Sequence, residues 1–457
     1  MRALVYGLAI TGVATVRALQ RHGWTVAVGD DRIDDDTRAV ARELGVELVP
    51  IIDMSNAKEL VVDGAYELLS PAPGVPESHA VIVAALSAGV PVMSEIELAY
   101  RWEREREGGP RPILAITGTD GKTTTTEMTV AMLRAAGVRT AALGNTDTPL
   151  VDAIDRTGEE ELDAFVVECT SFRLAWTQQF RADAAVWLNL APDHLNWHTS
   201  LDSYIAAKGR IFGLQQADDA AIGFAADSVV QAHLAVAPGR RITFGVSGAD
   251  YRLETIEGQT ILVGPQGHIA PANGMRRALP HDLTNALAAA ALVLETGLVT
   301  PAHIQAALAE FTPPRHRLEL VAEADGITWF NDSKATTPHA ASTAIRAFPS
   351  LVLIAGGSRK GVDLAQMGER ATGVRAVVAI GEAAPDIHAV FDPITSVTDA
   401  HSMPDAVRAA ADLAHPGDAV VLSPGCASFD WYSGYPARGD DFVAAVRELI
   451  ANQEALS

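Results

Sequence analysis

The residues in this sequence best suited to chemistry lie in one glycine-rich stretch. An apolar run at 113–116 is followed by Gly-Thr-Asp-Gly at 118–121, and Lys122 and Thr123 then open a predicted helix. Such a turn at a helix start exposes backbone N–H groups to phosphate, while a lysine and a hydroxyl suit terminal phosphates and Mg²⁺. The spacing is the short G-T-x-G-K-T form. The stretch favours a nucleotide triphosphate site, and an ordinary glycine-rich turn is the alternative.

Two more chemical groups follow predicted buried strands. Residues 165–171 end in Glu168 and two hydroxyls, and residues 184–190 lead into a polar loop that contains His194. Ligands of open α/β sheets bind at the carboxyl ends of the strands, where both side chains should lie. A carboxylate and an imidazole there suit a divalent metal beside a triphosphate. The alternative is a glutamate that caps a neighbouring helix and a solvated loop histidine.

The lysines are few. Of the 35 basic residues only five are lysines, and the rest are arginines. Where a bare positive charge suffices, the sequence uses arginine, so each lysine marks a place where an ammonium or its amine is needed. The five lysines are Lys58, Lys122, Lys208, Lys334 and Lys360.

The first residues have the outline of a Rossmann-type βαβ unit. The predicted elements are a strand at 3–6, a glycine turn at 7–12, a helix at 13–22 and a strand at 25–29. Asp30, Asp31 and Arg32 follow, and an acidic residue there suits a ribose. Ala9 replaces the middle glycine of the dinucleotide fingerprint. A mononucleotide or the diphosphate of a UDP-sugar therefore fits as well as a dinucleotide.

The rest of the chain also alternates strands and helices, as a mostly parallel sheet requires. A helix is predicted at 80–89, a strand at 90–93, and a charged, glycine- and proline-rich boundary at 101–112. A second linker is predicted at 311–317, after which strands end in polar loops. The predicted domains are 1–109, 110–313 and 314–457.

Composition restricts the class of protein. The chain of 457 residues is 48% hydrophobic and 20% charged, as in globular proteins, and its net charge of −22 disfavours nucleic acid or an anionic membrane as partner. There is no apolar run of 18 residues and no signal peptide pattern. The two cysteines suit a reducing compartment. We therefore expect a cytoplasmic protein, acting as a monomer on small molecules.

Several motifs together resemble the Mur ligase family of ATP-dependent amide ligases over essentially the whole chain. Gly-Thr-Asp-Gly-Lys-Thr at 118–123 is similar to the family's GTNGKT. Asn-Asp-Ser-Lys-Ala-Thr at 331–336 and Ser-Pro-Gly-Cys-Ala-Ser-Phe-Asp at 423–430 are similar to the glutamate-adding branch. The other matching motifs lie at 168–172, 193–194, 207–208, 281–286 and 316–317.

The resemblance implies an α/β protein with three domains. These are an N-terminal Rossmann-like UDP-binding domain, a central P-loop ATPase-like domain with a mostly parallel sheet, and a C-terminal Rossmann-like α/β domain. ATP would phosphorylate the carboxylate of UDP-MurNAc-L-Ala, and the amine of glutamate, with D-glutamate preferred over L-glutamate, would attack the acyl phosphate. The implied catalytic residues are Lys122, Glu168, His194 and Lys208.

Two Mg²⁺ sites are implied, with Thr123, Glu168, His194 and Lys208 as ligands. In the family, the lysine at the position of Lys208 carries a carbamate formed with CO₂, which serves as a carboxylate ligand. An arginine could not replace it, because a guanidinium does not form this carbamate. The alternative is a solvated lysine on a helix.

The resemblance also implies three sets of binding residues. The ATP set is Gly118, Thr119, Asp120, Gly121, Lys122, Thr123, Thr124, Asn285, Arg317 and Asp332. The UDP-substrate set is Gly7, Thr11, Gly12, Asp30, Asp31, Arg32, Asn145 and Ser171. The glutamate set is Lys334, Thr336, Lys360, Ser428 and Phe429.

Three positions depart from the family's pattern: Asp120 stands for asparagine, Ser358 for the frequent aspartate, and Ala9 for glycine. Other functions stay open beside the glutamate-adding ligase. A ligase of the same family could add another amino acid, and an oxidoreductase could use the first domain for NAD(P). A third alternative is a P-loop protein that hydrolyses ATP without ligation.

Overall fold

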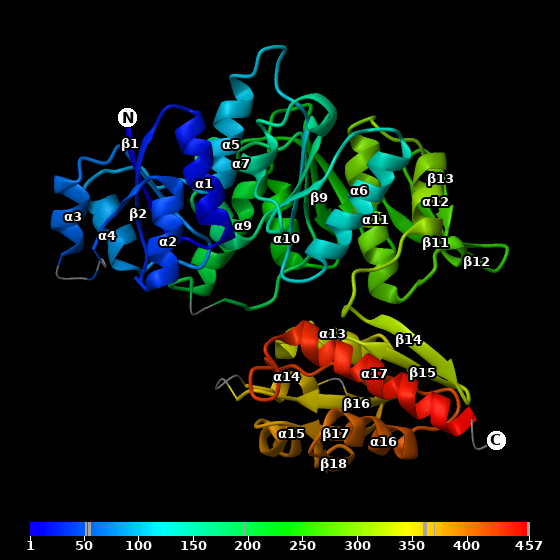
Figure 1. Ribbon diagram of the computed structural model, residues 1–457. Coiled ribbons are helices and arrows are strands. Elements are labelled where there is room, and N and C mark those ends of the chain that lie inside the picture. The colour runs from blue at the N-terminus through cyan, green and yellow to red at the C-terminus, as the bar shows by residue number, and fades with distance from the viewer. Residues whose placement is uncertain (51–52, 54–55, 195–196, 360–362, 370, 455–457) are drawn as a thin grey trace. The chain divides into compact units, whose positions relative to one another are not determined.

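The computed structural model describes residues 1–457 except 51–52, 54–55, 195–196, 360–362, 370 and 455–457. The described chain forms two compact units, Met1–Phe311 and Thr312–Ser457. The division falls inside the stretch 311–317 that the sequence predicts to be a linker. Figure 1 labels the elements of both units.

Unit 1 begins with a parallel sheet of strand order β3-β2-β1-β4 among the described residues. Its strands are β1 (Arg2–Tyr6), β2 (Thr25–Gly29), β3 (Glu47–Leu48) and β4 (Leu68–Pro71). The accompanying helices are α1 (Ile10–Arg21), α2 (Asp35–Leu44), α3 (Ala57–Asp63), α4 (Ala80–Ser87) and α5 (Glu95–Arg104). The βαβ unit predicted from the first residues is confirmed.

Two local predictions in this sheet are wrong. Helix α1 begins at Ile10, not at residue 13. Gly7, with φ +95°, reverses the chain direction after β1, so the turn is shorter than the sequence predicts. The strand predicted at 90–93 is reduced to a bridge between Val92 and Leu69. Pro91 lacks an N–H and cannot extend a ladder.

The second sheet of unit 1 is parallel throughout its described strands, in the order β10-β9-β8-β5-β7-β6. Its strands are β5 (Ile113–Thr117), β6 (Ala142–Gly144), β7 (Phe165–Glu168), β8 (Ala184–Trp187), β9 (Ala220–Phe224) and β10 (Arg240–Phe244). Its helices are α6 (Lys122–Ala135), α7 (Leu150–Ala153), α8 (Ser171–Ala175), α9 (Leu201–Gly213), α10 (Ser228–Ala235), α11 (Pro280–Glu295) and α12 (Pro301–Glu310).

Both faces of this sheet are covered, which explains why its strands are apolar runs. Leu114 and Ile116 of β5 belong to one core cluster with α6, α11 and α12, while Ile113 and Ala115 belong to another with α9 and α10. The second cluster also contains β1 and α1, so the two sheets of unit 1 share a core. The prediction of an α/β fold with parallel sheets is confirmed.

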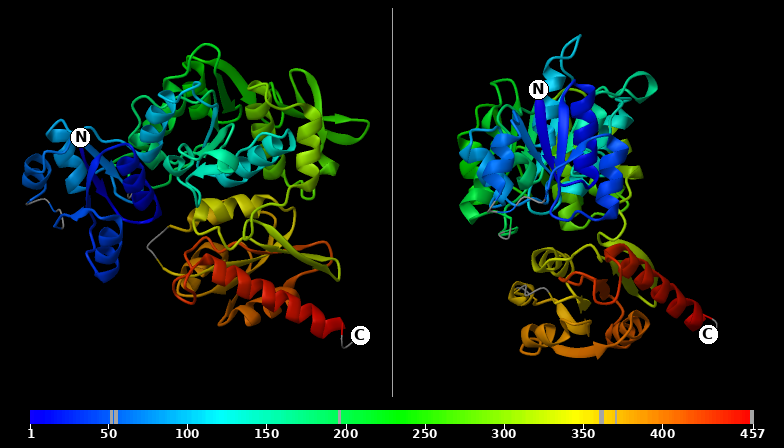
Figure 2. Two further views of the ribbon diagram at one scale, coloured as in Figure 1. Left: turned by 45° about the horizontal axis from the view of Figure 1, so that its top comes forward. Right: turned by 60° about the vertical axis from the view of Figure 1, so that its left-hand side comes forward.

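An antiparallel sheet in the order β11-β12-β13 follows β10. Its strands are β11 (Arg252–Ile256), β12 (Gln259–Gly264) and β13 (Gly267–Pro271). The β11–β12 hairpin projects from the body of unit 1 (Figures 1 and 2). In the sequence, this antiparallel sheet lies between β10 and α11.

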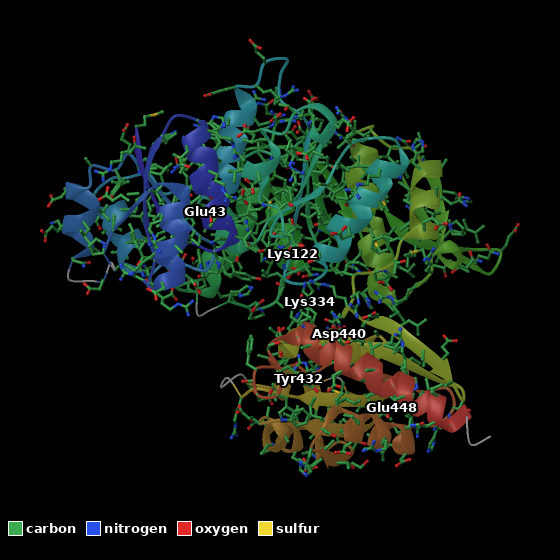
Figure 3. The ribbon with its side chains drawn as sticks, in the orientation of Figure 1. Glu43, Lys122, Lys334, Tyr432, Asp440 and Glu448 are labelled. Carbon is green, nitrogen blue, oxygen red and sulfur yellow. The ribbon has the colours of Figure 1, made fainter. Side chains whose placement is uncertain are left out.

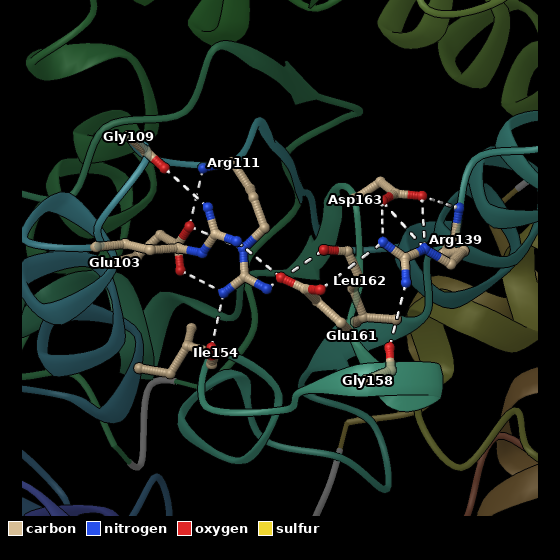
Figure 4. A network of polar contacts seen from close by, with 10 residues as sticks. Glu103, Gly109, Arg111, Arg139, Ile154, Gly158, Glu161, Leu162 and Asp163 are labelled. Carbon is tan, nitrogen blue, oxygen red and sulfur yellow. Dashed lines mark hydrogen bonds and ion pairs between the residues drawn. The ribbon is translucent and has the colours of Figure 1, made fainter.

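The predicted boundary at 101–112 is a packed junction. Helix α5 continues to Arg104, and Glu103 accepts hydrogen bonds from the backbone N–H of Arg111 at 2.8 Å and from its guanidinium at 2.9 and 2.6 Å. Both side chains are buried (Figure 4). Arg111 also donates to the carbonyls of Ile154 and Leu162. This ion pair fastens the end of α5 to the start of β5.

Unit 2 contains one mixed sheet, in the order β14-β15-β19-β16-β17-β18 within the described residues. Only β14 runs antiparallel to its neighbour. The strands are β14 (Glu319–Ala324), β15 (Ile327–Asn331), β16 (Leu351–Gly356), β17 (Val374–Ile380), β18 (Ser396–Ala400) and β19 (Ala419–Leu422). The helices are α13 (Pro338–Arg346), α14 (Ala365–Gly368), α15 (Ala384–Phe391), α16 (Met403–Leu413) and α17 (Tyr435–Glu454).

The Glu103–Arg111 pair gives a test of the junction. We expect Glu103→Ala to lower the free energy of unfolding by about 3–5 kcal/mol, because a buried guanidinium then loses its carboxylate. Glu43, labelled in Figure 3, forms an exposed pair with Arg17 at 3.1 Å, and Glu43→Ala should lower it by less than about 1 kcal/mol. Urea unfolding measures both. Equal effects of the two substitutions would contradict this account.

Candidate active site

The turn predicted to bind phosphate joins β5 to α6. Gly121 has φ +81°, and Lys122 begins α6 (Figure 3). A Cβ added to Gly121 would lie 2.6 Å from Oδ1 of Asn285, a buried residue of α11. Glycine is required here by both the backbone conformation and the close approach of Asn285. The structure thus brings Asn285, predicted from a distant motif, to the phosphate turn.

Asn189, which the sequence argument did not single out, holds this turn from the next strand. Its Oδ1 accepts from the N–H of Thr119 at 3.0 Å and of Asp120 at 2.9 Å, and its Nδ2 donates to the carbonyl of Asp120 at 3.2 Å. The available signal was a polar residue two positions after the end of the apolar strand β8. The turn is therefore shaped before any ligand binds.

Two lysine side chains converge on the carbonyl oxygen of Gly118. Lys122 Nζ donates to it at 3.0 Å and to the carbonyl of Thr119 at 2.8 Å, and Lys208 Nζ, from α9, donates to Gly118 at 2.6 Å. Lys208 is 2% exposed. Burial lowers the pKa of Lys208 well below its ordinary value, and the charge of Lys122 adds to this. The neutral amine is favoured at this position.

Tyr204 connects this lysine to the turn. Its hydroxyl lies 3.0 Å from Thr119 Oγ1, and Lys208 Nζ lies 4.7 Å from the centre of its ring. Burial raises the pKa of Tyr204, so its hydroxyl keeps its proton.

His194 follows β8 and adopts φ +55°. Its ring packs edge-on against Phe172, with centroids 4.6 Å apart, and its Nε2 lies 3.2 Å from Asp193 Oδ2. Burial lowers the pKa of His194, against the opposing effect of Asp193. The charges of Lys122 and Lys208 lower it further. A neutral imidazole near two amines can accept a proton or a metal ion.

Glu168 ends β7, directly beside β5, where it pairs with Ile116. The residue is 1% exposed; its Oε1 accepts from Asn145 Nδ2 at 2.8 Å, and its Oε2 has no donor among the described residues. A buried carboxylate oxygen without a donor fits a bound cation. The described part of the chain holds no group of three or more His, Cys, Asp and Glu side chains able to hold a metal by themselves.

Arg173 is a central residue of this site that the sequence argument missed. Its guanidinium is buried and pairs with Glu95 at 3.0 Å. It also donates to Asn145 Oδ1 at 2.9 Å and to Thr11 Oγ1 at 3.2 Å. Because Asn145 in turn holds Glu168, Arg173 connects the predicted UDP-substrate turn to the predicted metal ligand. An arginine in a short helix gave no sequence signal.

Ser171 lies in a second polar connection between the sheets of unit 1. Its hydroxyl is 2.9 Å from Nε2 of His198, and Nδ1 of His198 is 3.6 Å from Glu77 Oε2. Glu77 also accepts from Ser203 Oγ at 2.7 and 2.8 Å. Glu77 precedes α4, whereas the other three residues belong to the central sheet region. The contact with His198 holds the Ser171 hydroxyl in place.

The predicted UDP-binding residues form a tight turn at the carboxyl end of β1. A Cβ on Gly12 would lie 1.8 Å from the carbonyl oxygen of Gly7. Asp30 accepts from the N–H groups of Leu8 at 2.9 Å and Arg32 at 3.1 Å. In addition, Asp31 Oδ1 accepts from the Tyr6 hydroxyl at 2.7 Å and lies 3.0 Å from His79 Nε2. Asp30 therefore holds the turn, and Asp31 connects the end of β1 to His79.

The remaining predicted residues belong to unit 2. Asp332 is held by the N–H of Leu318 at 3.2 Å and the hydroxyl of Ser423 at 2.7 Å. The Nζ of Lys334 lies 5.3 Å from the ring centre of Tyr435. Of the other predicted residues, Ser428 is buried, Phe429 is 64% exposed, Thr336 donates its N–H to the carbonyl of Lys334, and Arg317 precedes β14. Lys360 lies outside the described residues.

Family models match both units. Residues 116–293 match the Mur ligase middle domain, and residues 316–426 match the Mur ligase glutamate ligase domain. The chain belongs to the Mur ligase family. None of its described helices combines the length and the apolar character needed to cross a membrane.

Individual relatives carry names that are more specific than the family descriptions. A protein of Frankia casuarinae named UDP-N-acetylmuramoylalanine--D-glutamate ligase is 42% identical over 97% of this chain and 93% of its own. A protein of the same name from Streptomyces coelicolor is 38% identical over 98% of each chain.

Solved structures share the fold at low sequence identity. MurF ligase from Thermotoga maritima in complex with ADP has a TM-score of 0.59 and 18% identity over 84% of this chain and 95% of its own. UDP-N-acetylmuramate-alanine ligase MurC from the same organism has a TM-score of 0.56 and 19% identity over the whole of both chains. This likeness concerns the fold alone.

The approach of Asn285 to the turn can be tested with two glycines of equal conformation. Gly121 and Gly137 both have φ +81°, but a Cβ on Gly137 has no atom within 4 Å. We expect Gly121→Ala to weaken ATP binding by about tenfold or more, because the methyl group displaces Asn285 and strains the turn. Gly137→Ala should leave binding unchanged. Calorimetric titration with a non-hydrolysable ATP analogue measures both, and equal affinities would contradict the account.

Proposed function

We propose that this protein is an ATP-dependent ligase that joins D-glutamate to UDP-N-acetylmuramoyl-L-alanine, a step of peptidoglycan precursor synthesis. The observation that carries the proposal is that Lys122 and Lys208 both donate to the carbonyl of Gly118, directly after β5, and that Glu168 ends the adjacent strand β7. The names of relatives that are 42% and 38% identical over nearly their whole length support it.

The reaction has two steps. A carboxylate oxygen of the UDP-substrate attacks the γ-phosphorus of ATP, the bond to the β,γ-bridging oxygen breaks, and ADP leaves. The glutamate amine then attacks the acyl carbon, inorganic phosphate leaves, and the amine loses a proton. In the first step two anions must meet, so positive charge and positioning supply most of the catalysis. Lys122 provides charge at the phosphates.

The proposed Mg²⁺ ligands are Thr123, Glu168, His194 and Lys208, the last as its carbamate. Bound Mg²⁺ neutralises phosphate and carboxylate charge and orients the two reactants. The free Oε2 of Glu168 and the lowered pKa of His194 fit this assignment. Asn145 keeps Glu168 in place through its amide.

Carbamate formation is favoured by the state of Lys208. The nitrogen lone pair of a neutral amine forms a bond to the carbon of CO₂, one C=O electron pair moves to oxygen, and a proton leaves to solvent. Burial and Lys122 together lower the pKa of Lys208, which favours the neutral amine that this reaction requires. The product is an anion beside Lys122, which removes the repulsion between two cations.

The binding sets of unit 1 follow from the same site. The turn 118–121 with Thr123 and Thr124 takes the ATP phosphates, and Asn285 the adenine. Gly7, Thr11, Gly12 and residues 30–32 take the UDP end, and Asn145 and Ser171 the sugar-peptide end. Arg173 contacts both Thr11 and Asn145, and His198 contacts Ser171. These contacts support the proposal that one extended UDP-substrate binds along these residues.

In unit 2 we assign Arg317 and Asp332 to ATP, and Lys334, Thr336, Lys360, Ser428 and Phe429 to glutamate. We further propose a three-domain enzyme, with Rossmann-like first and third domains at 1–109 and 314–457, that acts as a cytoplasmic monomer. The buried polar strand ends of β15 and β19 support a ligand site in unit 2.

The function is tested by phosphate release with ATP, Mg²⁺ and UDP-MurNAc-L-Ala, in separate reactions with D-glutamate, L-glutamate and no amino acid. We expect one phosphate per amide formed, with D-glutamate only. Phosphate release without an amino acid would identify an ATPase. Ligation of L-alanine or diaminopimelate instead would identify another ligase of the family.

The carbamate is tested by Lys208→Arg, which keeps a long basic side chain but cannot react with CO₂. We expect kcat to fall about 100-fold or more, together with loss of the carbamate signal in ¹³C NMR with ¹³C-bicarbonate. Lys58→Arg, the same change at an exposed lysine of α3, should retain both. An active Lys208→Arg enzyme would refute the assignment.

A further inference from the structure

Arg438, in the first turn of α17, is a buried cation that forms no ion pair within 4.0 Å with any residue that the structure describes. It is 1% exposed, and Asp430 and Asp332 act on its charge from a longer distance. Burial lowers the pKa of Arg438 to about 10, so the guanidinium remains charged at neutral pH. Burying such a charge is unfavourable unless its donors are satisfied.

The donors of Arg438 are satisfied by two loops of unit 2. Nε donates to Ser333 Oγ at 3.0 Å, and Nη2 donates to the Ser333 carbonyl at 2.8 Å. Both Nη atoms donate to the carbonyl of Cys426 at 3.1 Å, and Nη1 also donates to that of Ala427 at 3.2 Å. One planar guanidinium thus joins the loop after β15 to the loop after β19.

A third loop packs on the same group. A Cβ on Gly357 would lie 3.0 Å from Arg438 Nη1 and 2.3 Å from the carbonyl oxygen of Ala427, and the N–H of Ser358 donates to that carbonyl at 2.8 Å. Gly357 has φ +136°. The loop after β16 can approach the guanidinium only because this residue has no side chain.

The contacts also set the direction of one peptide. In a trans peptide the carbonyl and the following N–H point in opposite directions. Because the carbonyl of Ala427 points to Arg438, the N–H of Ser428 points away from it. Within the described chain this N–H has no acceptor, although Ser428 is 2% exposed. An oriented, unused amide donor suits a carboxylate.

We propose that Arg438 is a positioning residue of the amino-acid site: by holding the carbonyls of Ser333, Cys426 and Ala427 it fixes the loops that carry Lys334 and Ser428, and so sets the affinity for the dicarboxylic amino acid. It acts through these loops and does not touch the substrate. The inference rests on the proposed function, since it requires glutamate to bind at these loops.

Arg438→Ala tests it in the full-length enzyme. We expect KM for D-glutamate to rise about tenfold or more, because the loops lose charge-assisted hydrogen bonds, while KM for ATP and for UDP-MurNAc-L-Ala stays unchanged. Added guanidinium, which can occupy the vacated space, should lower the KM for D-glutamate again, and urea of similar shape without charge should not. Arg375→Met, which removes an ion pair with Asp418 elsewhere in unit 2, should leave all three values unchanged.

If the Arg438→Ala variant does not fold, substitutions of two serines test the same proposal. Ser333→Ala removes one acceptor of Arg438, whereas Ser342→Ala removes an equally buried hydroxyl that donates to the carbonyls of Pro338 and Gln366. Ser333→Ala should raise KM for D-glutamate about threefold or more, and Ser342→Ala should not.

Three results would overturn the inference. They are an unchanged KM for D-glutamate in Arg438→Ala, a parallel loss for all substrates without rescue, and equal effects of the two serine substitutions. Failure of the unmutated enzyme to ligate D-glutamate would instead refute the proposed function, so the two failures are distinguishable.

Discussion

Two amines sharing one carbonyl oxygen impose the main electrostatic constraint on this site. Lys122 and Lys208 both donate to the carbonyl oxygen of Gly118. Two ammonium groups that share one acceptor repel each other, and little water screens the repulsion in a buried site. The strain is relieved when Lys208 is neutral or becomes an anion, and when phosphate arrives at Lys122. A phosphate group that binds at the turn would therefore be attracted to Lys122, although the whole chain carries a net charge of −22.

The parallel sheets convert distant sequence positions into one site. Strands β5, β7 and β8 are adjacent, so the residues after them, the glycine turn, Glu168 and the 189–194 loop, share one edge. Arg173 then extends this edge to Thr11 of the first sheet. Since the two sheets also share a core, the proposed substrate turn and metal ligand are held by one packed body. The side chains at this edge are positioned accurately because the sheet that carries them is rigid.

The sequence predicted those parts of the structure that depend on local pattern. Strands β5, β7 and β8 are apolar runs because both faces of a parallel sheet are covered. Glu168 ends β7, and Lys122 follows β5 after the glycine turn. The start of α1 and the strand at 90–93 were wrong, since a single glycine or proline decided them. The sequence argument missed Arg173 and Asn189, because the residues that they contact lie far along the chain. Their types alone resemble solvated surface residues.

The unequal use of lysine and arginine acquires a structural meaning from these contacts. Arg111, Arg173 and Arg438 are buried, and each guanidinium joins several acceptors from separate segments, which one ammonium group could not do with fixed geometry. Lys122 and Lys208 instead each present a single nitrogen to the carbonyl of Gly118. The three arginines therefore fix the positions of loops and strands, whereas the two lysines place one nitrogen each at the proposed phosphate turn.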